Sequence, residues 1–242
     1  MQLPLNLIEP PVPHLADGVI GRNTAALDAL QSVLAGHAGG FASLFLWGAP
    51  GSGKTFWLRA WANDHPERAS YLDCDPQAGG GKDAAQQLDQ AVESLGHGNK
   101  TPCWLIDNID LAESDTVARL FRLYNAARES GSPIVAAAAV APLHLSMRDD
   151  LRTRLGQGLI FELHELSDEE KRDALRERAR RLGLPLSDEL LNYLLTRLPR
   201  NLGRLTQIID GLNEITLSRQ RTATIPLLKE LLDSLNATTR PV

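Results

Sequence analysis

The stretch Gly48-Ala49-Pro50-Gly51-Ser52-Gly53-Lys54-Thr55 decides the fold of this chain. It fits the phosphate-binding loop G-x-x-x-x-G-K-[ST] at every fixed position, a pattern in which backbone N–H groups surround a phosphate while the lysine adds positive charge. An apolar strand is predicted before the loop, at 43–47, and a helix after it, at 56–63, so a helix N-terminus would face the phosphates. The sequence therefore predicts binding of a nucleoside di- or triphosphate. The predicted nucleotide-binding positions in this loop are Gly48, Gly51, Ser52, Gly53, Lys54 and Thr55.

Composition narrows the class of protein. Of the 242 residues 43% are hydrophobic and 23% charged, as in ordinary globular proteins. No apolar run reaches the roughly 18 residues of a membrane span, and no secretion signal is recognisable. Cys74 and Cys103 each adjoin a predicted strand and are interpreted as reduced thiols, so we expect a cytoplasmic protein. The net charge of −5 argues against a protein that binds nucleic acid over its whole surface.

Apolar runs alternate with helical stretches over residues 19–165. This alternation predicts an α/β domain with a parallel sheet covered on both faces. A helix is predicted to begin with Asn23 as its N-cap. Residues 1–18 contain four prolines and are predicted to form an extended arm. The strand-length apolar runs are Leu44–Trp47, Ala69–Leu72, Cys103–Ile106, Ile134–Val140 and Leu159–Leu163.

The pattern becomes purely helical over residues 166–242. Ser167 and Glu170 form a capping box that opens a helix reaching about Leu182. Further amphipathic helices are predicted at 187–198, near 202–217 and at 225–235. The chain is therefore expected to end in a small all-helical lid domain.

A second part of the nucleotide site is predicted at Cys103-Trp104-Leu105-Ile106-Asp107. An acid at the end of a buried strand beside the phosphate loop can hold Mg²⁺, so Asp107 and Thr55 are the predicted metal ligands. The next residue is Asn108, where many P-loop ATPases carry a second carboxylate. Because an amide cannot accept a proton from the attacking water, intrinsic hydrolysis should be slow. The six histidines show no ligand spacing that would add another metal site.

The order of these elements resembles the DnaA/Hda family of AAA+ ATPases, and most of all its Hda members, over nearly the whole chain. In that resemblance Ile20 lies in the N-terminal box that packs against adenine, and Asp107 and Asn108 belong to the Hda form of the acidic strand. The stretches that carry the resemblance are Val19–Asn23, Leu105–Ile109, Leu120–Asn125, Leu166–Lys171 and Thr224–Pro226.

The N-terminal stretch Gln2-Leu3-Pro4-Leu5-Asn6-Leu7 fits the hexapeptide with which bacterial proteins dock on the DNA polymerase sliding clamp. Gln2 would bond in a small polar pocket, while Leu5 and Leu7 would fill an apolar groove. The predicted clamp-binding residues are Gln2, Leu3, Pro4, Leu5 and Leu7. The alternative is a β-segment that packs on its own domain.

The resemblance also assigns roles to arginines. Arg154, with Arg152 as the alternative, takes the position of an arginine finger that enters a neighbouring subunit's nucleotide site and stabilises charge on the γ-phosphate. The other interpretation is an ordinary surface arginine. Arg204, ahead of Arg200, is the candidate to contact nucleotide phosphate from the lid. Ala139 replaces the polar residue with which the initiator senses the γ-phosphate. The lid arginines 172, 176, 178, 180 and 181 are interpreted as a solvated helix face rather than a nucleic-acid contact.

Three functions remain open from the sequence. The first is a regulator that holds ADP or ATP with Mg²⁺, docks on the sliding clamp and uses Arg154 to stimulate hydrolysis of DnaA-bound ATP. The second is an autonomous AAA+ ATPase that loads or remodels a replication protein. Because the chain stops after the lid and is acidic, sequence-specific DNA binding is not expected. A purely binding adaptor is a third possibility, and a homodimer is compatible with all three.

Overall fold

The computed structural model describes residues 12–36, 41–77, 81–96, 103–198 and 201–238. The predicted clamp-binding residues 2–7 and Arg200 lie outside these ranges. The chain divides into two compact units, of which one spans Pro13–Glu165 and the other contains the chain from Leu166 onward. Each unit has its own hydrophobic core.

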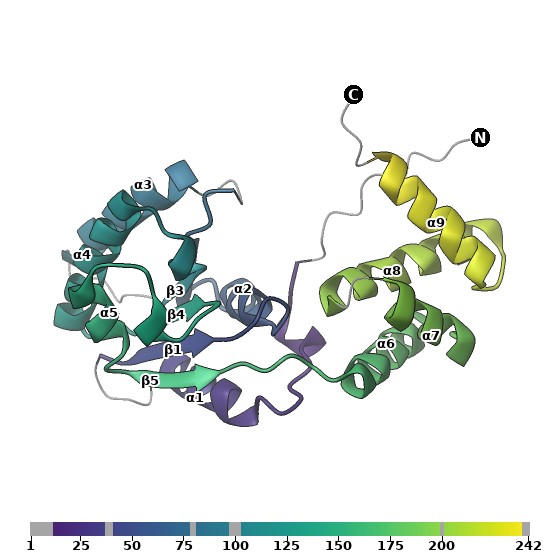
Figure 1. Cartoon of the computed structure of the whole chain (residues 1–242), viewed down its shortest axis with the longest axis horizontal. Coiled ribbons are helices and arrows are strands. Elements are labelled where there is room, and N and C mark those ends of the chain that lie inside the picture. The colour runs from purple at the N-terminus through teal and green to yellow at the C-terminus, as the bar shows by residue number, and fades with distance from the viewer. Residues whose placement is uncertain (1–11, 37–40, 78–80, 97–102, 199–200, 239–242) are drawn as a thin grey trace. The chain divides into compact units, whose positions relative to one another are not determined.

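The first unit is built on a parallel sheet with strand order β2-β3-β4-β1-β5 (Figure 1). The predicted α/β fold is thereby confirmed. β4 ends before Ala139 and not at Val140 as predicted, because the Ala139 N–H donates to the Asp110 side chain (3.2 Å) instead of continuing the sheet. The strands are β1 (Ser43–Trp47), β2 (Ala69–Asp73), β3 (Cys103–Asp107), β4 (Ile134–Ala138) and β5 (Leu159–Glu162).

Helices cover both faces of the sheet because its strands alternate their side chains between two cores. Phe45 of β1 belongs to the core that includes side chains of α3 and α4, whereas Leu44 and Leu46 belong to the core that includes those of α1 and α2. Cys74 and Cys103 are buried free thiols, as predicted. The helices of this unit are α1 (Thr24–Leu34), α2 (Lys54–Asp64), α3 (Gly81–Gly96), α4 (Ser114–Ser130) and α5 (Asp149–Leu155).

Residues 13–18, predicted as part of an extended arm, are packed on α2. Leu15–Asp17 forms a turn of 3-10 helix whose first N–H donates to Asp64 (2.8 Å). The neighbouring His14 ring also bonds to Asp64 (2.5 Å). An Asp64 carboxylate that accepts both bonds gives these residues a fixed partner, which composition alone did not reveal.

Asn23 occupies the N-cap position of α1, as predicted, but its side chain does not cap the helix. Instead its amide donates to the His164 carbonyl (3.0 Å) and its oxygen accepts from the His164 N–H (2.8 Å). These two bonds hold the chain just after β5 and explain why a polar side chain that is only 3% exposed is tolerated there.

The described residues from Leu166 onward form helices joined by short loops and no strand, as predicted. The Ser167 hydroxyl accepts from the Glu170 N–H (3.2 Å), and the Glu170 carboxylate accepts from the Ser167 N–H (2.7 Å), which confirms the capping box. None of the described helices in either unit is long and apolar enough to cross a membrane. The lid helices are α6 (Asp168–Leu182), α7 (Asp188–Arg197), α8 (Leu202–Arg219) and α9 (Ile225–Thr238).

Candidate functional site

The phosphate-loop sequence connects β1 to α2, as its motif predicts. Gly51 (φ 92°) and Gly53 (φ 97°) adopt left-handed backbone conformations that disfavour any side chain. Gly48 lies so close to the end of β5 that a Cβ there would come within 2.2 Å of the Leu163 carbonyl oxygen. The curved backbone and the helix N-terminus together make a cradle suited to an anion.

Lys54 is buried in this loop. Its ammonium donates to the carbonyl oxygens of Gly48 (2.6 Å) and Ala49 (3.1 Å) and to the Ser52 hydroxyl (3.4 Å). Burial lowers the pKa of Lys54, while the nearby carboxylates of Asp107, Asp110 and Glu165 oppose that shift. The loop thus holds a positively charged side chain. Its present hydrogen-bond acceptors are protein oxygens, which the oxygens of a bound phosphate can replace.

Asp107, at the end of β3, is fully buried and hydrogen-bonded to the Thr55 side chain. Burial raises the pKa of Asp107, whereas the hydrogen bonds from Thr55 and Tyr71 lower it and the charge of Asp73 raises it further. The structure therefore brings together the two predicted Mg²⁺ ligands. A hydroxyl and a carboxylate beside a phosphate cradle are the donor set that Mg²⁺ uses with nucleotides, so these residues fit the metal.

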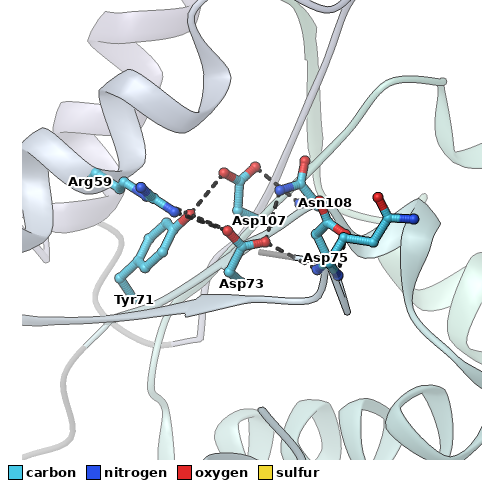
Figure 2. A network of polar contacts seen from close by, with 7 residues as sticks. Arg59, Tyr71, Asp73, Asp75, Asp107 and Asn108 are labelled. Carbon is cyan, nitrogen blue, oxygen red and sulfur yellow. Dashed lines mark hydrogen bonds and ion pairs between the residues drawn. The ribbon is translucent and has the colours of Figure 1, made fainter. Parts of the chain in front are cut away.

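A polar network extends from Asp107 to β2 and α2 (Figure 2). The Tyr71 hydroxyl lies 3.0 Å from Asp107 Oδ2 and 3.3 Å from Asp73 Oδ2, and it accepts from Arg59 Nε (3.0 Å). Arg59 also donates to Asp73 Oδ2 (3.0 Å). Burial, and secondarily the charge of Asp107, raises the pKa of the Tyr71 hydroxyl, which therefore remains a proton donor at neutral pH.

Asn108 joins the same network from the other side. Its backbone N–H donates to Asp107 Oδ1 (3.0 Å), and its side-chain amide donates to Asp73 Oδ1 (2.8 Å). It adopts a left-handed backbone conformation (φ 53°), which Asn tolerates better than most residues. The amide is thus engaged with an acid on the next strand.

Sequence analysis missed Asp73, Tyr71 and Arg59. A usable signal was present, because Ala69–Leu72 followed by Asp73 repeats the pattern of an apolar strand ending in an acid. The pairing of β2 with β3 places Asp73 directly beside Asp107. That lateral relation depends on strand order, which the local pattern does not specify.

Arg154 lies in the last turn of α5 and is half-buried. Its guanidinium lies 5.0 Å from the centre of the Phe121 ring and 6.0 Å from that of Tyr124, while the Tyr124 hydroxyl donates to its carbonyl (3.0 Å). In the part of the chain that the structure describes, no carboxylate pairs with Arg154, whereas Arg152 pairs with Asp149 (2.8 Å). Aromatic faces therefore hold a guanidinium that has no ion pair among the described residues.

The remaining predicted residues are not members of this network. Ile20 is exposed, next to Gly21 in a turn before α1. Arg204 is exposed in the first turn of α8, where its N–H is capped by Asn201 (3.0 Å). Ala139 follows β4 and is exposed. No structural contact tests the roles predicted for these three residues.

The lid arginines match the interpretation as a solvated helix face only in part, because Arg178 is part-buried and pairs with an acid of α8. Arg178 makes a bidentate pair with Asp210 (2.8 and 3.0 Å), and Arg176 bonds to Asp188 (2.6 Å). Arg180 and Arg181 share Glu177, whose pKa falls to about 2 because of their hydrogen bonds. Intramolecular partners thus account for most of this cluster.

Comparison with known families decides the relationship of the chain. The sequence model of the bacterial DnaA ATPase domain matches residues 16–162, which is more than half of the chain. The chain belongs to the DnaA family. The lid model of Hda matches residues 168–232, which agrees with the predicted resemblance to the DnaA/Hda family.

Solved structures of DnaA share the fold of this family member. Domain III of DnaA from Thermotoga maritima has 23% identity and a TM-score of 0.68, with 93% of this chain and 97% of that chain covered. AMPPCP-bound DnaA from Aquifex aeolicus has 22% identity and a TM-score of 0.65 (85% and 65% covered). The Holliday junction branch migration motor RuvB from Thermotoga maritima is more distant, with 15% identity and a TM-score of 0.59 (89% and 68% covered).

Proposed function

We propose that this protein is a nucleotide-bound regulator of replication initiation, with ADP as its resident nucleotide. In this proposal it docks on the DNA polymerase sliding clamp and stimulates hydrolysis of ATP bound to DnaA. The DnaA ATPase and Hda lid matches support the family context, and DnaA from Aquifex aeolicus is a relative that binds AMPPCP. A cytoplasmic location and the absence of sequence-specific DNA binding belong to the same proposal.

The nucleotide would be held by the phosphate loop. Backbone N–H groups of residues 51–55 would bind phosphate oxygens, and Lys54 would exchange its carbonyl partners for them. Thr55 and Asp107 would hold Mg²⁺, which neutralises phosphate charge when bound. Ile20 would pack on adenine, and Arg204 would approach a phosphate from the lid.

The chain's own hydrolysis is expected to be weak. Asn108 supplies an amide where a carboxylate would orient water, and that amide is already bonded to Asp73. Ala139 has no side-chain donor for a γ-phosphate. Both features favour a protein that keeps its nucleotide and acts on another protein's nucleotide.

The observation that carries the proposal is the environment of the Arg154 guanidinium. Its guanidinium rests on Phe121 and Tyr124, and among the described residues no acid neutralises it. A partner's γ-phosphate would provide the missing negative charge. Arginines delivered in this way accelerate phosphoryl transfer by about 10³–10⁵-fold.

The decisive experiment follows labelled ATP bound to DnaA in the presence of clamp loaded on DNA. Adding this protein should accelerate hydrolysis, and Arg154→Ala should remove about 10³-fold or more of that acceleration. Arg152→Ala is the matched control, because it removes an arginine from the same helix that is already paired with Asp149. Equal loss in both variants, or no acceleration by the parent protein, would exclude a finger at Arg154.

Clamp docking needs its own test. Deletion of residues 1–7 should abolish binding to the sliding clamp, while the nucleotide affinity of the remaining chain should stay unchanged. Clamp binding that survives this deletion would contradict the assignment of Gln2, Leu3, Pro4, Leu5 and Leu7.

An autonomous ATPase that loads or remodels a replication protein is the second candidate. The complete phosphate loop and the buried Asp107 favour it. Multiple turnovers of ATP by the protein alone, stimulated by single-stranded DNA and insensitive to DnaA, would support this function over the first. A homodimer, tested by its mass in solution with and without nucleotide, fits either candidate.

A further inference from the structure

The acid and the amide next to Asp107, which are Asp73 and Asn108, differ in position from the two successive acids that many P-loop ATPases carry. Position 108, directly after Asp107, carries an amide, while an acid stands at Asp73 on the neighbouring strand. Because β2 and β3 are parallel with Asp73 opposite Asp107, the carboxyl ends of the two strands bring both carboxylates to the same edge of the sheet. The side chain of Asp73 is only 11% exposed.

Asp73 contacts each group that orients Asp107 from this side. Its Oδ1 accepts from the Asn108 amide (2.8 Å), and Asn108 donates its own N–H to Asp107 Oδ1 (3.0 Å). Its Oδ2 lies 3.3 Å from the Tyr71 hydroxyl, which is 3.0 Å from Asp107 Oδ2. Each oxygen of Asp107 therefore contacts a residue that also contacts Asp73, and the single Tyr71 proton is shared between the two carboxylates (Figure 2).

Asp73 also neutralises Arg59, the cation nearest to this pair in the network. Arg59 donates to Asp73 (3.0 Å) and to Tyr71 (3.0 Å), and its guanidinium lies 5.1 Å from the centre of the Tyr71 ring. The Tyr71 hydroxyl that accepts from Arg59 lies 3.0 Å from Asp107 Oδ2. A guanidinium released by loss of Asp73 would therefore be one residue away from Asp107, where it would compete with a metal ion for the same oxygens.

An acid at position 73 is satisfied by its neighbours, although the charge of Asp107 repels it. Its Oδ1 accepts from the Asn108 amide (2.8 Å) and from the Asp75 N–H (3.1 Å), and its Oδ2 accepts from Arg59 (3.0 Å). Because two of the residues that it contacts also bond to Asp107, these contacts place it behind a predicted metal ligand, where residues that orient such ligands lie.

We propose that Asp73 is a positioning residue for the divalent metal of the nucleotide site. Through Tyr71 and Asn108 it fixes the Asp107 carboxylate toward Thr55, and by binding Arg59 it keeps that guanidinium away from the metal. The second carboxylate of the site thus lies on β2, one strand away from Asp107. This inference rests on the proposed binding of nucleotide.

The test compares ADP affinity with Mg²⁺ and with EDTA, measured by isothermal titration calorimetry on the full chain. The measured quantity is the ratio of the two affinities, which isolates the metal. Asp73→Asn should lower this ratio about 10-fold or more, as substitutions behind metal ligands typically do, while the affinity in EDTA changes less than about twofold. Asp75→Asn is the matched control, because Asp75 carries the same charge two residues away and joins the network only through its backbone N–H, which donates to Asp73 (3.1 Å) and which the substitution keeps. Its carboxylate accepts from the Gln77 N–H (2.9 Å) instead.

A rescue variant separates positioning from damage to the fold. The exchange Asp73→Asn with Asn108→Asp keeps one carboxylate and one amide in contact with their order reversed, but Arg59 still lacks an acid at position 73. It should therefore recover only part of the ratio, and an exchange no better than Asp73→Asn alone would overturn the inference. An Asp73→Asn ratio equal to that of the parent or of Asp75→Asn would overturn the inference, as would equal losses with Mg²⁺ and EDTA. ADP that binds the parent equally well with and without Mg²⁺ would also overturn it. Failure of the parent to bind any adenine nucleotide would instead refute the proposed function.

Discussion

Replacement of Gly48 by alanine tests how tightly the phosphate loop is fixed to the sheet. The new Cβ would lie 2.2 Å from the Leu163 carbonyl oxygen and 2.9 Å from the Ser52 hydroxyl. Because the carbonyl belongs to backbone beside β5, the loop itself must move by about 1 Å, and such overpacking costs about 1–3 kcal/mol. We expect the thermal midpoint to fall by about 2–12 °C and ADP affinity to fall with it.

Gly158 offers a matched control at the opposite end of the same strand pair. A Cβ there would lie 2.2 Å from the Ser43 carbonyl oxygen, so the steric conflict is equivalent, but it is separated from the loop by the length of β1. Gly158→Ala should lower stability similarly and leave ADP affinity of the folded protein within about twofold. Equal ADP affinities for both variants, measured well below their thermal midpoints, would refute the claim that loop position depends on Gly48.

Three further predictions concern the free energy of unfolding, measured by urea titration without nucleotide. Burial raises the pKa of Asp107, so the folded protein binds that proton more tightly than the unfolded chain, and this contribution to stability is lost as pH rises through the raised pKa. Asp107→Asn should therefore increase stability more at about pH 7 than at about pH 4, and the reverse order would contradict the direction of the shift. Asn23→Ala should cost about 1–3 kcal/mol because the part-buried His164 N–H and carbonyl lose their partners; a neutral result would mean that water replaces the amide. Ser167→Ala should cost about 1 kcal/mol at the lid transition, and Glu170→Gln should cost less because its side chain can still accept the Ser167 N–H.

The elements that sequence predicted well are those whose signals are local. The phosphate loop is recognisable because glycines, lysine and threonine are required at fixed spacings by one piece of backbone. The parallel strands follow from short apolar runs, and the capping box at Ser167 and Glu170 depends on residues only three apart. Their physical causes lie within a few residues of one another, so a single sequence contains them.

The features that sequence analysis missed depend on contacts between distant segments. Asn23 has the right residue type and position for a helix cap, but a partner 141 residues away in the chain uses its side chain instead. Asp73 can be assigned to the site only once β2 is known to lie beside β3, with Tyr71 and Arg59 around it. The end of β4 similarly depends on Asp110, which is 29 residues away.

The two hydrogen bonds between the Asn23 side chain and the His164 backbone have a consequence for motion of the lid. His164 is pinned to the first unit by two hydrogen bonds, and the capping box of α6 already begins at Ser167. Glu165 and Leu166 are the residues between these anchors, so any reorientation of the lid through this connection is concentrated on a handful of backbone dihedral angles. Leu163, on the other side of His164, touches the first glycine of the phosphate loop. A change in backbone angles in this short connection would therefore act on Gly48, the residue where the phosphate loop begins.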